Sequence, residues 1–179
     1  ATQAVTVYDA TAPTVEIQGE PASVNSTTAY SVTFQFSEDV TGFVLGDITV
    51  GNGSADNFGT TDASTYTAEI TPDGNGDITI DVAAAVAQDA AGNDNTAATQ
   101  AVTVYDATAP TVEIQDAPAT VNSTTPYTVT IQFSEDVTGF VLGDITVVNG
   151  SADNFVAVNA STYTADITPD GNGDITIDV

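Results

Sequence analysis

The sequence predicts an all-β protein made of tandem antiparallel β-sandwiches, and two observations lead to this prediction. First, short segments alternate apolar and polar residues with a period of two, and turns rich in Gly, Asn and Asp separate them. Second, residues 1–82 align without a gap with residues 98–179, an offset of 97 residues, and differ at 12 positions. A 97-residue period is too long for a solenoid unit and matches one immunoglobulin-like (Ig-like) sandwich of about 100 residues.

The expected strands follow one another along the first repeat. They are residues 3–7, 14–17, 31–36, 43–50 (one or two strands, interrupted at Gly46), 65–70 and 77–82. In residues 31–36 the apolar side chains Val32, Phe34 and Phe36 share one face, as in a half-buried strand. Residues 51–57 and 72–77 are expected to be loops, and only residues 83–87 have the composition of a helical turn.

The repeat also defines the expected domains. A complete Ig-like module runs over residues 10–106. On this frame residues 1–9 are the last strand of a preceding module, and residues 107–179 are a second module without its final strand. The linker of residues 105–110 is short, and the fixed φ of Pro110 stiffens it.

Charge limits the possible partners and activities. The chain has 25 Asp and Glu residues, no Lys, Arg or His, and a formal charge of −25. Nucleic acid is excluded as a partner and an anionic membrane surface is disfavoured, because both would repel such a chain. No apolar run is long enough for membrane insertion. Without His, Cys or Lys there is no base or nucleophile suited to neutral pH, so we expect no enzyme.

Divalent cations are the favoured partners, and the topology indicates where they would bind. Loops alternate between the two ends of a sandwich, so the incoming linker, the loop after residue 36 and the loop at residues 88–94 should meet at one end. The expected ligands there are Asp9, Glu38, Asp39, Asp89, Asn93 and Asp94. Calcium takes six to eight oxygen ligands from carboxylates, amides and carbonyls, so this end is a candidate calcium site.

A second candidate lies at the opposite end. Asp73, Asn75 and Asp77 place oxygen ligands at i, i+2 and i+4, and Asp170, Asn172 and Asp174 repeat them in the second copy. That spacing opens many calcium loops. The alternative interpretation is a glycine-rich hairpin turn, because Asp-Gly and Asn-Gly are strong turn formers.

Four motifs together resemble the bacterial Ig-like repeats of very long surface proteins, including calcium-dependent adhesins of the repeats-in-toxin class. They are YDATAPTV at 8–15, FSEDVTGF at 36–43, GDIT at 46–49 and DAAGN at 89–93. The resemblance implies an extracellular, cell-surface protein whose modules join head to tail with calcium at their junctions. It also implies that Asp106, Glu135 and Asp136 are ligand candidates at the second junction, where the second copy stops before its counterpart of Asp89.

The leading functional hypothesis is therefore a spacer in a bacterial surface adhesin or fibre. One alternative is the subunit of an extracellular filament, in which residues 1–9 of one subunit complete the last module of the next and insert Val5 and Val7 into its core. Another is a module that binds carbohydrate or another cell through its loops. A binding domain of that kind should break the repeat with an aromatic-rich insertion, and the sequence has none.

Overall fold

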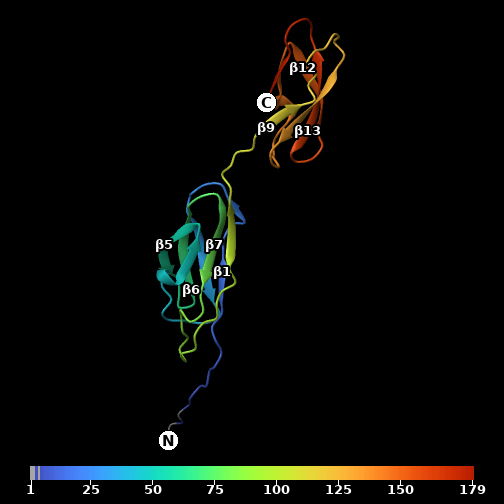
Figure 1. The fold of residues 1–179 in the computed structure, drawn as a ribbon. Coiled ribbons are helices and arrows are strands. Elements are labelled where there is room, and N and C mark those ends of the chain that lie inside the picture. Colours follow the sequence, from blue (N-terminus) through green and yellow to red (C-terminus); the bar gives the residue numbers. More distant parts are fainter. Residues whose placement is uncertain (1–2, 4) are drawn as a thin grey trace. The chain divides into compact units, whose positions relative to one another are not determined.

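The computed structural model describes residue 3 and residues 5–179; residues 1, 2 and 4, which belong to the strand expected at the start of the chain, lie outside it. Two compact units result, Ala1–Thr108 and Ala109–Val179 (Figure 1). Each is built from strands, and the predicted all-β, tandem Ig-like fold class is confirmed. Residues 5–9 form no strand in this chain.

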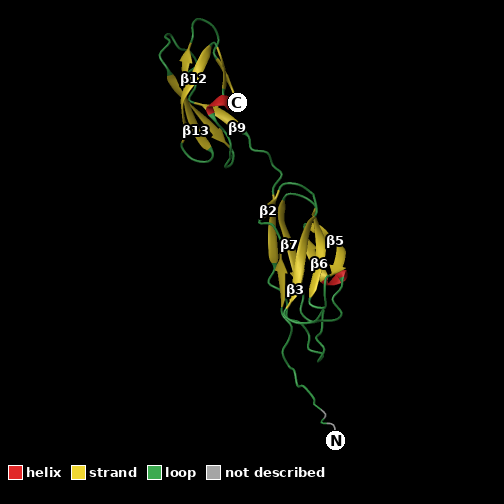
Figure 2. Ribbon diagram, turned by 180° about the vertical axis from the view of Figure 1, so that it is seen from behind, coloured by secondary structure: helices red, strands yellow, loops and turns green. Residues whose placement is uncertain are grey.

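The first unit packs two four-stranded sheets face to face (Figure 2). In order across the first sheet, its strands are β1 (Val15–Gln18), β3 (Tyr30–Phe36), β6 (Thr65–Pro72) and β5 (Gly53–Thr60). Across the second sheet they are β2 (Ser23–Val24), β8 (Ala101–Tyr105), β7 (Gly76–Val82) and β4 (Ile48–Gly51). All described pairings in this unit are antiparallel except that of the short β2 with β8, which is parallel.

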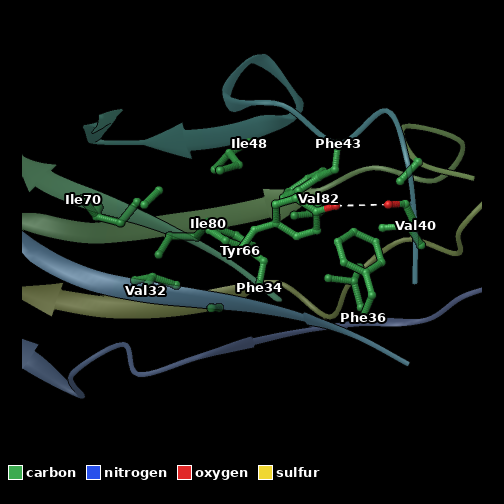
Figure 3. Close-up of a cluster of buried hydrophobic side chains, with 14 of the residues drawn as sticks. Val32, Phe34, Phe36, Val40, Phe43, Ile48, Tyr66, Ile70, Ile80 and Val82 are labelled. Atoms are coloured by element: carbon green, nitrogen blue, oxygen red, sulfur yellow. Dashed lines mark hydrogen bonds between the residues drawn. The ribbon is translucent and has the colours of Figure 1, made fainter. Parts of the chain in front are cut away.

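The core lies between the sheets and follows the alternation in the sequence. Val32 and Phe34 of β3 are fully buried, and their neighbours on the strand point outward. Phe43 packs edge-on against Phe36 and Tyr66, with ring centroids 5.1 and 5.2 Å apart, the geometry that aromatic pairs prefer (Figure 3). The aromatic rings fill the end of the sandwich from which the loops of the candidate site emerge.

Two expectations about local structure were wrong. The segment 51–57, expected to be a loop, contains the start of β5. Gly53 does not mark a turn; it is paired with β6 at a position where the two backbones lie too close for a side chain. A side chain there would lie 2.7 Å from the carbonyl oxygen of Thr71 on β6. Residues 83–87 form a turn without a helix. The interruption expected at Gly46 within residues 43–50 is present as the short 3₁₀ helix η1 (Leu45–Asp47), and β4 follows it.

The second unit repeats this architecture only in part. One sheet is complete, and its strands are, in order, β12 (Gly150–Ala157), β13 (Thr162–Pro169), β10 (Tyr127–Phe133) and β9 (Val112–Gln115). The other is reduced to the pair β11 (Thr146–Val148) and β14 (Thr176–Asp178), beside the 3₁₀ helix η2 (Leu142–Asp144).

None of the helices in the described part of the chain has the length and apolar character needed to cross a membrane.

Candidate metal centre

Three loops meet at one end of the first unit, where the segment leading into β1 also enters (Figure 1). Ser37, which follows β3, is tied to this incoming segment by two hydrogen bonds. Its N–H donates to the carbonyl of Thr14 at 2.9 Å, and its hydroxyl accepts from the Thr14 N–H at 3.0 Å. Tyr66 fixes the other side of the same loop, because its hydroxyl donates to the carbonyl of Val40 at 3.1 Å (Figure 3). The acidic pair at 38–39 is thereby held between two anchors.

The loop of residues 83–97 is organised by Asn95, whose side chain is buried. Its Oδ1 accepts hydrogen bonds from the backbone N–H groups of Val86 and Ala87, and its Nδ2 donates to the carbonyls of Ala83 and Thr96. All four bonds are 2.8–2.9 Å long, so every polar atom of this amide is used within the loop. Asn95 was not among the predicted residues, because an Asn beside Gly and Asp in a loop has the same local signature whether it is buried or solvated.

These loops bring Asp9, Glu38 and Asp89 together, and we call these three residues the acidic triad. One carboxylate oxygen from each lies within 4.8 Å of the others. Asp9 is exposed, Glu38 is half-buried and Asp89 is only 5% exposed. The triad therefore brings together carboxylates from the incoming linker, the loop after β3 and the loop of residues 83–97.

Asp89 is held in place by its own loop. Its Oδ1 accepts hydrogen bonds from the N–H groups of Ala91 and Asn93, both at 2.8 Å, and its Oδ2 accepts one from Asn93 Nδ2 at 2.8 Å. These donors, the Asn93 side chain foremost, lower the pKa of Asp89 below its ordinary value, so Asp89 is ionised at neutral pH. Asn93 Nδ2 also lies 3.3 Å from the carbonyl oxygen of Asp9, which places this predicted residue beside the linker.

The pKa of Glu38 shifts in the opposite direction. Partial burial raises it first, and the negative charges of Asp89 and Asp9 raise it further. No Lys, Arg or His exists anywhere in the sequence to neutralise this end of the unit. Three carboxylates that repel one another at ligand distance have the chemistry of a cation site, and a chain with neither His nor Cys offers only oxygen ligands.

The other two predicted residues of this end lie beside the triad. Asp39 is exposed and lines, with Asp9 and Glu38, a surface hollow of about 430 Å³. Asp94 is exposed, and its carboxylate accepts a hydrogen bond of 2.7 Å from Gln88 Nε2. Asp94 is thus engaged with its own loop, whereas Asp39 remains within the same hollow as the triad.

At the opposite end, residues 73–75 connect β6 of one sheet to β7 of the other, and Asp77 lies in β7 itself. The side chain of Asn75 is hydrogen-bonded to the outgoing linker. Its Oδ1 accepts from the N–H of Ala107, and its Nδ2 donates to the hydroxyl of Thr108, both at 2.9 Å. Asp73 and Asp77 are exposed. Because β6 and β7 belong to different sheets, this connection is not the hairpin turn of the alternative interpretation. Calcium at Asp73, Asn75 and Asp77 stays a prediction.

The remaining predicted ligands are exposed in both units. Asp106, in the first unit, caps its own linker by accepting a hydrogen bond of 2.9 Å from the N–H of Thr108. The second-unit candidates are Glu135, Asp136, Asp170, Asn172 and Asp174. Because Asp106 belongs to one unit and Glu135 and Asp136 to the other, their joint site stays a prediction.

Fold and loops together define a protein of tandem Ig-like sandwiches. The model of the family described as bacterial Ig-like domain matches residues 9–105 and again residues 106–179, and the chain belongs to this family. A search of curated proteins found no match.

Three solved bacterial structures are similar. Invasin, a bacterial integrin-binding protein, matches with a TM-score of 0.45 and 14% identity over 91% of this chain and 36% of its own. Yersinia pseudotuberculosis InvD matches with a TM-score of 0.38 and 17% identity over 92% and 51%. The adhesin InvE of the same organism matches with a TM-score of 0.33 and 14% identity over 92% and 53%. This chain thus spans between about a third and a half of the length of these proteins.

Proposed function

We propose that this chain is an extender segment of a bacterial surface adhesin or fibre, and that calcium stiffens the connections between its sandwiches. The proposed role is mechanical and non-catalytic, outside the cell. Two features support it: two bacterial Ig-like domains follow each other in one chain, and the sequence has 25 acidic residues and no basic one. Neighbouring modules of the same kind are the expected head-to-tail partners.

The acidic triad is the observation that carries the calcium part of the proposal. Asp9 belongs to the segment that enters the unit, while Glu38 and Asp89 belong to loops anchored on the sandwich. A cation shared by all three would attach the entering segment to the body of the unit. Without it, the ionised groups repel one another, and this repulsion adds to the effect of burial in raising the pKa of Glu38.

Calcium suits this site better than other common cations. It prefers carboxylate, amide and carbonyl oxygens and tolerates irregular coordination, whereas magnesium requires tighter octahedral geometry. Zinc is disfavoured, because its usual His and Cys ligands do not occur in the sequence. The triad, with Asn93 and Asp39 beside it, offers the required oxygen chemistry.

The direct test is calcium titration of the 179-residue chain by calorimetry, together with thermal melts in calcium, magnesium and EGTA. Calcium should bind and raise the melting temperature, since a ligand bound only by the folded state stabilises it by mass action, and magnesium should do so weakly. Glu38→Gln should weaken calcium binding roughly tenfold or more, because affinity at such sites follows the number of charged ligands. The matched control is Glu16→Gln, the same charge change at an exposed position on β1.

Stiffening needs a separate readout, which NMR relaxation of residues 5–9 provides. In EGTA their order parameters should resemble those of a flexible segment, below about 0.6, and in calcium those of Asp9 and Tyr8 should approach about 0.85. Glu38→Gln should prevent this change. Unaltered melting temperature and unaltered order parameters in calcium would contradict the proposal.

A further inference from the structure

Residues 106–108 follow β8 and lead out of the first unit, and each of their backbone N–H groups donates a hydrogen bond within that unit. The N–H of Asp106 donates to a β2 carbonyl at 3.0 Å, and that of Thr108 to the Asp106 carboxylate at 2.9 Å. The N–H of Ala107 donates to Asn75 Oδ1, also at 2.9 Å. All three residues are exposed, so these bonds, and not burial, fix the path of the linker.

Asn75 binds this linker with both ends of its side-chain amide. Besides accepting from the Ala107 N–H, it donates from Nδ2 to the Thr108 hydroxyl at 2.9 Å. Asn75 lies directly before Gly76, the first residue of β7, and Gly76 pairs with Tyr105, the last residue of β8. Asn75 therefore joins the chain after β8 to the start of the neighbouring strand, immediately beyond the last pair of the two strands.

The pairing of β8 determines how tension along the chain acts on it. The linker leaves the first unit at the end opposite to the acidic triad, where the incoming segment enters (Figure 1). A pull between these two ends therefore acts along β8, which pairs antiparallel with β7 and parallel with β2. Because the main-chain hydrogen bonds lie across the strands, such a pull loads them together in shear rather than one after another.

Under this pull β8 leaves the sheet by sliding past β7. The main-chain pairs from Gly76–Tyr105 to Ile80–Ala101 resist the movement. The two hydrogen bonds of Asn75 oppose the same movement, because they join the residues after β8 to the residue before β7. They are also the first contacts to receive tension that arrives through the linker.

We propose that these two hydrogen bonds, from Asn75 to Ala107 and Thr108, form a linker lock that holds β8 against β7 under tension and slows mechanical unfolding of the first unit. The linker lock rests on the mechanical role proposed above and does not require calcium. Both bonds are exposed to water and contribute little to equilibrium stability. Kinetic stability depends instead on interactions that are already broken in the transition state of unfolding, and contacts at the point where tension enters are of that kind.

The test is unfolding of the intact 179-residue chain at constant force between two attached handles. The sequence has no cysteine, so handles attach only at cysteines that are introduced. Ala10→Cys and Ala109→Cys are changes at exposed positions on either side of the first sandwich, and they load this unit through the linker. Measurements in EGTA, with a parallel series in calcium, separate the linker lock from the calcium proposal. Because the first handle follows Asp9, tension also does not enter through the acidic triad.

Variants of the two partners should change the rate of unfolding at a fixed force. Asn75→Ala should raise it about tenfold, the factor that corresponds to the net contribution of two hydrogen bonds. Thr108→Val, which removes one of these bonds, should raise it about threefold, and Thr108→Ser, which keeps the hydroxyl, should leave it unchanged. Added to Asn75→Ala, Thr108→Val should have no further effect, because its partner is already lost. The matched control is Asn25→Ala, the same change at an exposed position between β2 and β3.

A second pair of handles distinguishes the linker lock from an ordinary contribution to stability. Thr27→Cys, between β2 and β3, and Thr61→Cys, between β5 and β6, are changes at exposed positions. Tension between these two positions does not pass through the linker. With these handles Asn75→Ala should change the rate of unfolding by less than about twofold, because its bonds are not at the point where tension enters.

Each contrary outcome would overturn the proposal. Equal increases in rate with both pairs of handles would mean that Asn75 stabilises the fold without carrying tension. An unchanged rate when the chain is pulled through the linker would mean that main-chain pairing alone holds β8. An effect of Asn75→Ala that is present in calcium and absent in EGTA would assign this residue to a calcium site instead.

Discussion

The hydroxyl of Tyr66 donates a hydrogen bond to the carbonyl oxygen of Val40, and Tyr163 repeats this contact with Val137 in the second unit. The two contacts have different consequences. The loop before Val40 carries Glu38 of the acidic triad, whereas the corresponding loop of the second unit has no partner loop equivalent to residues 83–97 within residues 109–179. A tyrosine inside the first sandwich thus positions the loop that carries Glu38 of the acidic triad.

Tyr66→Phe should destabilise the first unit by about 1 kcal/mol, the usual net contribution of a hydrogen bond, and should also weaken calcium binding. The control, Tyr163→Phe, should destabilise the second unit by a similar amount and leave calcium affinity unchanged. Urea unfolding followed by NMR, with calcium titration of each variant, measures both effects. Equal calcium affinities in the two variants would show that this anchor does not position Glu38.

Asn95→Ala should be far more damaging than its place in a loop suggests. The substitution leaves four backbone groups of residues 83–96 without their partner in a region where Asn95 itself is only 2% exposed. We expect a loss on the order of 3 kcal/mol in the free energy of unfolding of the first unit. Gln100→Ala, which removes an exposed side-chain contact with Asp81, should cost little. Similar losses from both variants would argue against Asn95 as the organiser of the loop.

The raised pKa of Glu38, which burial and then the charges of Asp89 and Asp9 cause, makes a prediction about pH. The pKa of Glu38 is raised above its ordinary value of 4.5, so the fold favours the protonated acid, and this contribution is lost as pH rises through the raised pKa. In EGTA at pH 7, Glu38→Gln should therefore melt at a higher temperature than the original chain. The difference should shrink as pH falls through the raised pKa.

Calcium should reverse that order at pH 7, because the charged Glu38 is then a ligand. Asp89 behaves oppositely to Glu38: its lowered pKa means that its contribution is present above 3.8 and is lost as pH falls through the lowered value. Melting curves of both chains between pH 3 and pH 7 separate the two effects. A constant difference between the chains across this range in EGTA would contradict the raised pKa of Glu38.

The strands that were predicted well are those that bury one whole face. The strand predicted over residues 31–36 is observed as Tyr30–Phe36, and the strand predicted over residues 77–82 is observed as Gly76–Val82. Both were predictable because apolar and polar residues alternate wherever one face of a sheet lies in the core. The strand Gly53–Thr60 was missed because it lies at a sheet edge and its side chains are nowhere fully buried. Its Gly, Asp and Asn residues resemble a turn, and only pairing with β6 makes it a strand.

The candidate site was likewise predictable only in part. Alternating strand directions sufficed to place Asp9, Glu38 and Asp89 at one end of the unit. The spacing of acidic residues in the sequence does not show which carboxylates come together, because that depends on side-chain geometry. Asp94, for example, lies only five residues from Asp89, but its carboxylate accepts a hydrogen bond from Gln88. The register of β8 was equally inaccessible, because both faces of Val-Thr-Val carry residues typical of strands, and the less apolar face is the buried one.

Thr103 supplies the last prediction. It is completely buried, and within the described residues its hydroxyl has no hydrogen-bond partner, an arrangement that costs free energy. Thr103→Val should stabilise the first unit by about 1 kcal/mol, because it removes the unpartnered hydroxyl and nearly keeps the side-chain volume. Urea unfolding of the two chains measures the effect, and a Thr103→Val chain that is less stable than the original would show that the hydroxyl does have a partner.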